Sequence, residues 1–172
     1  MDVESKLIQG FTITDNGDGF TEKNRESFSE YLSNHKYELG CKGVGRFTWL
    51  KVFDSVYIKS YLPEQLVNIA FDKKYSEDDS IKIIDEYHDN ISTEIIFTKC
   101  INIEKSSTQL NLKIIKEEIL NHFILKFSVF KYNKQKFSII LKSTNGDEQE
   151  VITLEDVVDT NKKDYSLKNP DS

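Results

Sequence analysis

Apolar and polar residues alternate along five stretches of the chain, a period of two that is typical of strands with one buried face. These stretches are rich in Val, Ile, Tyr and Phe, and they cover residues 7–14, 55–62, 66–72, 81–87 and 93–99. The connections between the last four are too short for crossover helices, so antiparallel neighbours are expected. The residues at 88–90 are interpreted as a hairpin turn. The acidic run at 75–80 is interpreted as a solvated loop.

Three further stretches predict helices. Thr21 is expected to cap a short helix with Phe28, Tyr31 and Leu32 on one apolar face. Residues 47–53 have almost no polar face, so we expect this helix to be buried. Residues 110–127 should pack on the sheet through one apolar stripe. The stripe consists of Leu112, Ile115, Ile119, Phe123 and Phe127.

The end of the chain predicts one hairpin and a tail. Residues 137–141 and 151–154 alternate on either side of an Asn-Gly dipeptide, which is favoured in hairpin turns. Residues 159–172 are polar and are expected to form a loose tail. The chain has no repeat and no internal boundary, so a single domain is expected over 1–158. The predicted fold is an α+β two-layer sandwich, with a mixed, mainly antiparallel sheet and helices on one face.

Composition narrows the classes of function. The chain has 172 residues, enough for a real core, and a net charge of −6, which argues against direct nucleic-acid binding as its main role. Its two cysteines, Cys41 and Cys100, lack the spacing of a metal or redox site, which favours reduced thiols. Neither a signal peptide nor a membrane-spanning apolar stretch is found, so we expect a cytoplasmic protein without a membrane partner.

Two glycine-bearing segments carry the candidate chemistry. The first reads DNGDGF from Asp15 to Phe20 and follows a predicted strand; the second reads GCKGVGRF from Gly40 to Phe47 and precedes a predicted helix. The carboxylate of Asp15 can accept a hydrogen bond from the amino group of adenine. It disfavours guanine, which has a carbonyl oxygen at that position. Glycines let the backbone pass beneath a base and let N–H groups converge on phosphates at the start of a helix. Lys42 and Arg46 are expected to add mobile positive charge.

A calcium-binding loop does not fit the first segment. An EF-hand loop that starts at Asp15 needs glycine at its sixth position, where Phe20 stands. A loop that starts at Thr14 has Thr14 at its first and Arg25 at its last position, where acids are required. Calcium is therefore not expected.

Other phosphate-binding loops do not fit the second segment. A P-loop that starts at Gly40 needs Lys and then Ser or Thr after Gly45, but Arg46 and Phe47 stand there. A dinucleotide-binding fingerprint should follow a strand closely, and here a polar, helical stretch comes before the glycines. The remaining alternative is that both segments are ordinary glycine turns.

Taken in order, the two segments resemble the GHKL ATPases, the Bergerat-fold family of gyrase, heat-shock chaperones, histidine kinases and MutL proteins. Its adenine box, Asp-x-Gly-x-Gly, and its phosphate box, Gly-x-x-Gly-x-Gly, are both matched. The matching residues are Asp15, Gly17 and Gly19, then Gly40, Gly43 and Gly45. The family also has a Thr on a later strand, for which Thr93 is the candidate, although Ser92 replaces the Gly that usually precedes it. The resemblance covers roughly residues 7–100.

The resemblance implies an adenine-nucleotide (ATP) binding module of a GHKL-type ATPase, with Mg²⁺ as a cofactor. It also implies a lid that closes over ATP and is coupled to a larger protein, and His35 and Lys36 could then reach the γ-phosphate. The candidate nucleotide-binding residues are Asp15, Gly17, Gly19, Phe20, Lys36, Gly40, Lys42, Gly43, Val44, Gly45, Arg46, Phe47 and Thr93.

One family feature has no counterpart at residues 1–10. This is an earlier helix whose Glu activates the attacking water and whose Asn holds Mg²⁺. Glu30 and Asn34 have the same spacing but lie between the two boxes. We therefore assign no catalytic residue and no metal ligand, leave ATP hydrolysis open, and expect Mg²⁺ to be held by phosphates, water or another residue. The expectation is a GHKL domain without its front helix, either truncated or degenerate.

Alternatives remain open for function and assembly. One is a non-catalytic interaction domain that keeps the fold but has lost nucleotide chemistry, with the helix at 110–127 as a partner surface. A histidine-kinase-like phosphotransfer module is less well supported, because no His-bearing helix precedes the domain. A dimer, or further domains before and after this chain, are open partner assignments.

Overall fold

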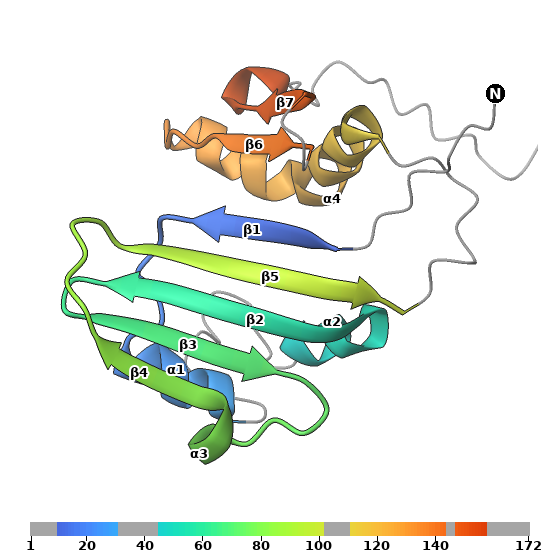
Figure 1. The fold of residues 1–172 in the computed structure, drawn as a ribbon. Coiled ribbons are helices and arrows are strands. Elements are labelled where there is room, and N and C mark those ends of the chain that lie inside the picture. Colours follow the sequence, from blue (N-terminus) through green and yellow to red (C-terminus); the bar gives the residue numbers. More distant parts are fainter. Residues whose placement is uncertain (1–9, 31–44, 102–110, 144–146, 158–172) are drawn as a thin grey trace, which may run out of the picture. The chain divides into compact units, whose positions relative to one another are not determined.

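The computed structural model describes residues 10–30, 45–101, 111–143 and 147–157 (Figure 1). The chain divides into two compact units, residues 1–109 and 110–172. Helices and antiparallel strands occur in both, so the predicted α+β class is confirmed. Several predicted features lie outside the described residues: the start of the first strand, Tyr31 and Leu32 of the first helix, the Asn-Gly dipeptide and the C-terminal tail.

The first unit contains a five-stranded antiparallel sheet in the order β1-β5-β2-β3-β4 (Figure 1). The predicted strands are confirmed with small shifts at their ends. The bounds are β1 Phe11–Asp15, β2 Phe53–Leu62, β3 Gln65–Phe71, β4 Ile81–Asp85 and β5 Ser92–Cys100.

The predicted hairpin turn at 88–90 is wrong. β4 is an edge strand that pairs with β3. β5 lies on the other side of the β2–β3 hairpin, between β2 and β1. The connection therefore crosses the end of that hairpin, where the backbone N–H of His88 donates to the carbonyl oxygen of Pro63 at 3.1 Å. Alternation along a strand shows which side chains are buried but not which strand is the neighbour.

The described residues of the first unit include three helices: α1 Glu22–Ser29, α2 Gly45–Val52 and α3 Glu77–Ser80. The predicted cap of α1 is confirmed, since Thr21 Oγ1 accepts from the N–H of Asn24 at 3.4 Å. α3 occupies the stretch predicted to be a loop. Ser76 caps it, and the three acids of its first turn suit the positive end of a helix.

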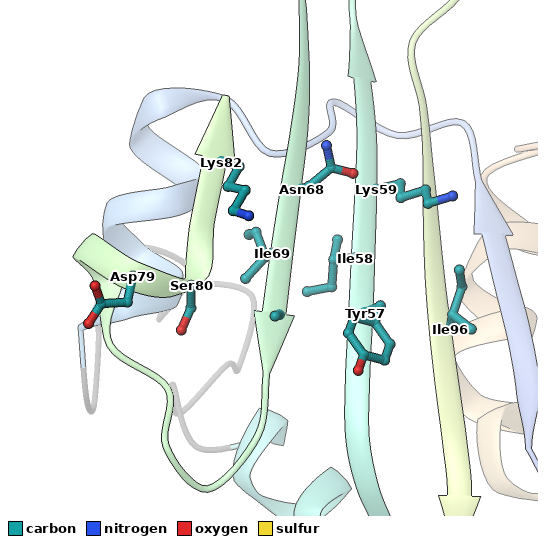
Figure 2. A pocket seen from close by; sticks show the side chains of 10 residues that line it. Tyr57, Ile58, Lys59, Asn68, Ile69, Asp79, Ser80, Lys82 and Ile96 are labelled. Carbon is teal, nitrogen blue, oxygen red and sulfur yellow. The ribbon is translucent and has the colours of Figure 1, made fainter. Parts of the chain in front are cut away.

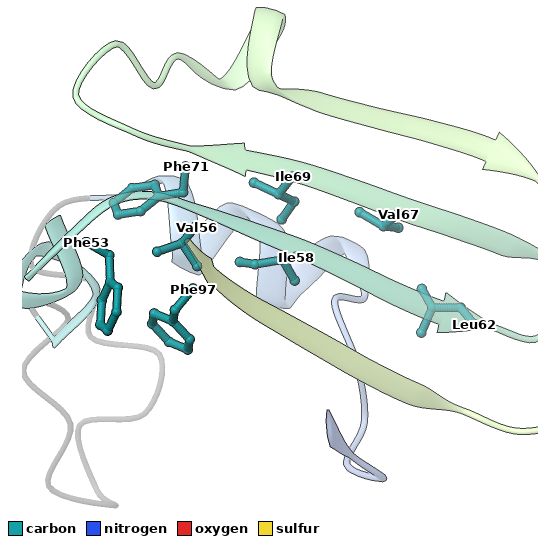
Figure 3. Close-up of a cluster of buried hydrophobic side chains, with 8 residues drawn as sticks. All are labelled: Phe53, Val56, Ile58, Leu62, Val67, Ile69, Phe71 and Phe97. Carbon is teal, nitrogen blue, oxygen red and sulfur yellow. The ribbon is translucent and has the colours of Figure 1, made fainter. Parts of the chain in front are cut away.

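The core of the first unit lies on the face of the sheet that α1 and α2 cover. Phe28 of α1 and Trp49 of α2 contact the ring of Phe71, which is only 2% exposed. Because strand residues alternate between faces, every second residue of β2 and β3 is buried there. The cluster consists of Phe53, Val56, Ile58, Leu62, Val67, Ile69, Phe71 and Phe97 (Figure 3).

The expectation that α2 is buried on all sides is wrong. Phe47 is 38% exposed and Val52 is 44% exposed, while Trp49 and Leu50 pack partly against the core. An eight-residue helix on one side of a sheet can bury only one of its faces. The buried residue of α2 is Arg46, which the sequence pattern does not predict.

Within residues 111–143 and 147–157, the second unit contains α4 Leu112–Tyr132, the strands β6 Ile139–Lys142 and β7 Gln149–Ile152, and the short helix η3 Leu154–Asp156. The predicted antiparallel pairing of the two strands is confirmed. α4 extends five residues beyond the predicted end and contacts β6, β7 and η3. Its packing on the five-stranded sheet stays a prediction.

Lys116 of α4 connects that helix to β7 and η3. Lys116 Nζ donates to the carbonyl oxygen of Val151 at 2.7 Å and lies 2.8 Å from Asp156 Oδ1. Asp156 also accepts from the N–H of Thr153 in a capping box. The hydrogen bond from Lys116, followed by that from Thr153, lowers the pKa of Asp156 below its ordinary value.

The ion pair between Lys116 and Asp156 predicts that the second unit becomes less stable in acid. Since the folded-state pKa is lowered, the ionised Asp156 stabilises the fold above its ordinary pKa, and this contribution is lost as the pH falls through the folded value. Lys116→Met is expected to cost about 1 to 2 kcal/mol at neutral pH. Asp156→Asn should flatten the acid dependence, whereas the exposed Glu155→Gln should not. Amide hydrogen exchange over α4 and β7 between about pH 5 and pH 2.5 measures both effects.

Candidate functional site

The strand register brings three polar residues into one row across the sheet. Asp15 lies opposite Thr93 in the β1–β5 pair, and Thr93 lies opposite Ser60 in the β5–β2 pair. Ser60 and Thr93 are 0% and 2% exposed on the helix-covered face. Side chains of directly opposed residues share one face, so Asp15 belongs to the same row. Two residues assigned from the sequence, Asp15 and Thr93, are therefore direct neighbours.

The first glycine segment turns immediately beyond this row. The N–H of Gly17 donates to Asp15 Oδ1 at 2.9 Å, and the N–H of Phe20 donates to Ser60 Oγ at 2.8 Å. Gly19 has φ +70°, and a Cβ there would lie 2.7 Å from Ser60 Oγ and 2.8 Å from a methyl carbon of Leu62. Only glycine combines this backbone conformation with so close an approach to β2.

The carbonyl groups of the turn are held from the other side by α1. Asn24 Nδ2 donates to the oxygen of Gly19 at 2.7 Å, and Arg25 Nη1 donates to the oxygen of Phe20 at 3.0 Å. Both donors come from the first turn of the helix that follows the segment. The turn is thus fixed to β2 through its N–H group and to α1 through its carbonyls.

Two hydroxyl groups form the buried part of the row. Ser60 Oγ and Thr93 Oγ1 are 3.3 Å apart, and either oxygen could be the donor. Asp15 is exposed, and its Oδ2 accepts no hydrogen bond from any residue that the structure describes. The row therefore presents one acceptor at the surface beside a buried pair of hydroxyls.

Arg46 is held in place, so the expectation of a mobile charge at this position is wrong. Its guanidinium donates to the carbonyl oxygen of Glu30 at 2.8 Å and lies 4.4 Å from the ring centre of Phe47 and 5.2 Å from that of Phe28. The side chain is 8% exposed, and burial lowers the pKa of Arg46 below its ordinary value. Arg46 thus links the end of α1 to the first turn of α2.

The second glycine segment is described only at its end. Gly45 opens α2, and a Cβ placed there would meet no atom of the described residues within 4 Å, so packing against them does not require glycine at this position. The ring of Phe47 lies 6.1 Å from that of Phe71. The other candidates lie outside the described residues: Lys36, Gly40, Lys42, Gly43 and Val44, and with them His35, Asn34 and Cys41.

Sequence reasoning missed three residues that shape the site: Ser60, Asn24 and Arg25. Ser60 has a recognisable signal, since it is the polar member of the inward-facing series Val56, Ile58, Ser60 and Leu62. A buried hydroxyl at such a position needs hydrogen-bond partners. The roles of Asn24 and Arg25 have no sequence signal, because both depend on where the preceding turn lies.

A hollow on the opposite face of the sheet does not belong to this site. It has a volume of about 360 Å³ and is lined by Tyr57, Lys59, Asn68 and Lys82, among others (Figure 2). None of the candidate residues contributes to it.

The described part of the chain offers no ready metal centre and no membrane span. Within it, no three His, Cys, Asp or Glu side chains are grouped so that they could hold a metal ion. None of its helices combines the length and the apolar character needed to cross a bilayer.

Comparisons with known proteins give one point of reference. No protein-family model matches the chain, and no curated protein matches it significantly. One matching solved structure is the 43K ATPase domain of Thermus thermophilus gyrase B in complex with an aminocoumarin. It shares 14% sequence identity with a TM-score of 0.47, and the match covers 83% of this chain but only 37% of that one. At this TM-score and identity, the similarity supports no argument about the site or its ligand.

Proposed function

We propose that this chain is an adenine-nucleotide-binding module. The observation that carries the proposal is the sheet register, which places the exposed carboxylate of Asp15 beside Thr93 and directly before an anchored glycine turn. The carboxylate can accept from the amino group of adenine, and the turn gives a flat base close access to the backbone. The two glycine boxes and their resemblance to GHKL ATPases support ATP as the nucleotide.

The finer parts of the proposal follow from the resemblance. The segment between the boxes acts as a lid over ATP, and its closure is coupled to a larger protein. Mg²⁺ enters with the nucleotide and is held by phosphate oxygens and water. Hydrolysis is not part of the proposal, because no residue is assigned to the roles of the family's Glu and Asn.

Calorimetric titration of the full chain with ATP and ADP, each with and without Mg²⁺, tests the proposal. We expect saturable binding of one nucleotide per chain, with GTP much weaker because its carbonyl oxygen faces the Asp15 carboxylate. Binding that is unchanged without Mg²⁺ would indicate that the protein supplies no metal ligand. A folded chain that binds neither ATP nor ADP would contradict the proposal.

The second candidate function is a non-catalytic interaction domain. It is favoured by apolar side chains that follow one another at helical spacing on α4, namely Leu125, Val129 and Tyr132, which are 80%, 54% and 88% exposed. A folded chain that self-associates without binding nucleotide would favour this function, and sedimentation of the chain used for calorimetry distinguishes the two.

A further inference from the structure

The buried hydroxyl of Ser60 connects the first glycine turn to Thr93. Ser60 is 0% exposed, and its Oγ contacts both the glycine turn, through the N–H of Phe20 at 2.8 Å, and Thr93 Oγ1 at 3.3 Å. Its neighbours along β2 on the same face, Ile58 and Leu62, are apolar, and so is Val67 opposite it on β3. The surroundings of this hydroxyl therefore decide where its single proton points.

The Ser60 hydroxyl has two partners, of which one is a donor, and this bears on the direction of its proton. A serine hydroxyl has one proton and two lone pairs, and the N–H of Phe20 occupies one lone pair. Among the described residues, Thr93 Oγ1 is the one acceptor within hydrogen-bond distance of Ser60 Oγ. Donation by Thr93 would leave the Ser60 proton without an acceptor at a position that is 0% exposed. Donation by Ser60 leaves the Thr93 proton instead at a position that is 2% exposed and lies opposite the exposed Asp15, where an incoming ligand can accept it. Ser60 thus donates, and the proton of Thr93 is left for another acceptor.

We propose that Ser60 is a positioning residue that fixes the Thr93 hydroxyl as a hydrogen-bond donor beside the Asp15 acceptor, and so selects amino-purine over oxo-purine nucleotides. This inference rests on the proposed function. Adenine presents an amino donor next to a ring-nitrogen acceptor, which complements the acceptor of Asp15 and the donor of Thr93. Guanine and hypoxanthine present the reverse order, a carbonyl next to a ring N–H.

The small exposure of Thr93 is compatible with this role. One water between the hydroxyl and the base would keep the same polarity, since it accepts from Thr93 and donates to the ring nitrogen. Without Ser60 the Thr93 hydroxyl can rotate and either donate or accept, so the site loses one of its two discriminating contacts. Ser60 acts through Thr93 and need not touch the nucleotide.

The test is a double-mutant cycle of Ser60→Ala and Thr93→Val on the full chain, with dissociation constants for ATP and inosine triphosphate from calorimetry. The readout is the preference for ATP, which a merely structural role would leave unchanged. We expect Thr93→Val to reduce this preference about tenfold and Ser60→Ala about fivefold. In the Thr93→Val background, Ser60→Ala should change the preference less than about twofold.

A matched control exists on the same two strands. Ser55 Oγ and Thr98 Oγ1 also form a hydroxyl pair across β2 and β5, at 2.8 Å and away from the glycine turn. Ser55→Ala is expected to leave the preference for ATP unchanged. If Ser60→Ala does not fold, Ser60→Cys keeps a similar side-chain size with weaker hydrogen bonds and should reduce the preference by a smaller factor.

Each outcome decides a different point. Equal losses of affinity for ATP and inosine triphosphate, or equal effects of Ser60→Ala in both backgrounds, would overturn the role of Ser60 and leave nucleotide binding intact. A folded wild-type chain that binds neither nucleotide would overturn the proposed function, and the role of Ser60 with it.

Discussion

Asp15→Ala is expected to lower the affinity for ATP about a hundredfold, the largest effect of any single substitution on binding. The substitution removes the acceptor that faces the amino group of adenine, a hydrogen bond to a charged group that is worth more than a neutral one. Asp15 is exposed, and its Oδ2 accepts no hydrogen bond from the described residues. This oxygen can therefore accept a hydrogen bond from a bound adenine. Calorimetry with ATP measures the effect.

Two variants separate this role from a local structural one. Asp15→Asn keeps an oxygen that can accept from the N–H of Gly17, so the turn should remain while the charge is lost. Asp18→Ala removes an exposed carboxylate from the same turn and should change the affinity less than about twofold. ATP affinity that is the same for Asp15→Ala and for the wild-type chain would show that adenine is not bound at this carboxylate.

Gly19→Ala is expected to lower the free energy of unfolding of the first unit by about 2 to 4 kcal/mol. The residue has φ +70°, and the added Cβ would lie 2.7 Å from Ser60 Oγ and 2.8 Å from a methyl carbon of Leu62. Both contacts are closer than carbon atoms tolerate, so the turn must move away from β2 and weaken the hydrogen bond from the N–H of Phe20 to Ser60.

Denaturant unfolding followed by the fluorescence of Trp49, the single tryptophan of the chain, measures this loss in the relevant unit. Gly45→Ala is the matched control, since a Cβ at Gly45 meets no atom of the described residues within 4 Å and alanine favours a helix. It should be neutral or stabilise by up to about 1 kcal/mol. Equal unfolding midpoints for Gly19→Ala and Gly45→Ala would show that the turn does not depend on glycine at position 19.

The strands were predictable because their signal is local. Alternation of apolar and polar residues identified all five strands of the main sheet, and the cap at Thr21 marked the start of α1. α3 was missed because four residues capped by Ser76 are too short for a helical period. α4 continues beyond its predicted end because Phe130, three residues after Phe127, extends the apolar side of the helix and lies 5.8 Å from the ring of Phe137. That contact depends on the position of Phe137, which the pattern along the helix does not show.

The candidate site was predictable only in part. Asp15, Gly19 and Thr93 came from motif spacing, and the register brings Asp15 and Thr93 together as neighbours. Ser60 was missed because its importance depends on β2 lying next to β5, which no local pattern encodes. Arg46 was expected to be a mobile charge because a basic residue beside glycines is typical of a phosphate loop, but aromatic rings and the carbonyl oxygen of Glu30 hold it.

Residue types and their order were enough to predict the α+β class, the strand positions, and the two glycine boxes with the carboxylate that begins the first. These features have local signals, because hydrophobic periodicity and backbone sterics depend directly on residue type and on spacing along the chain. The folded sheet was needed to show that β5 lies between β1 and β2, and therefore that Asp15, Thr93 and Ser60 form one row. Strand order depends on how the strands pack against one another across the whole sheet. The alternation of residues along one strand shows its buried face but not its neighbour.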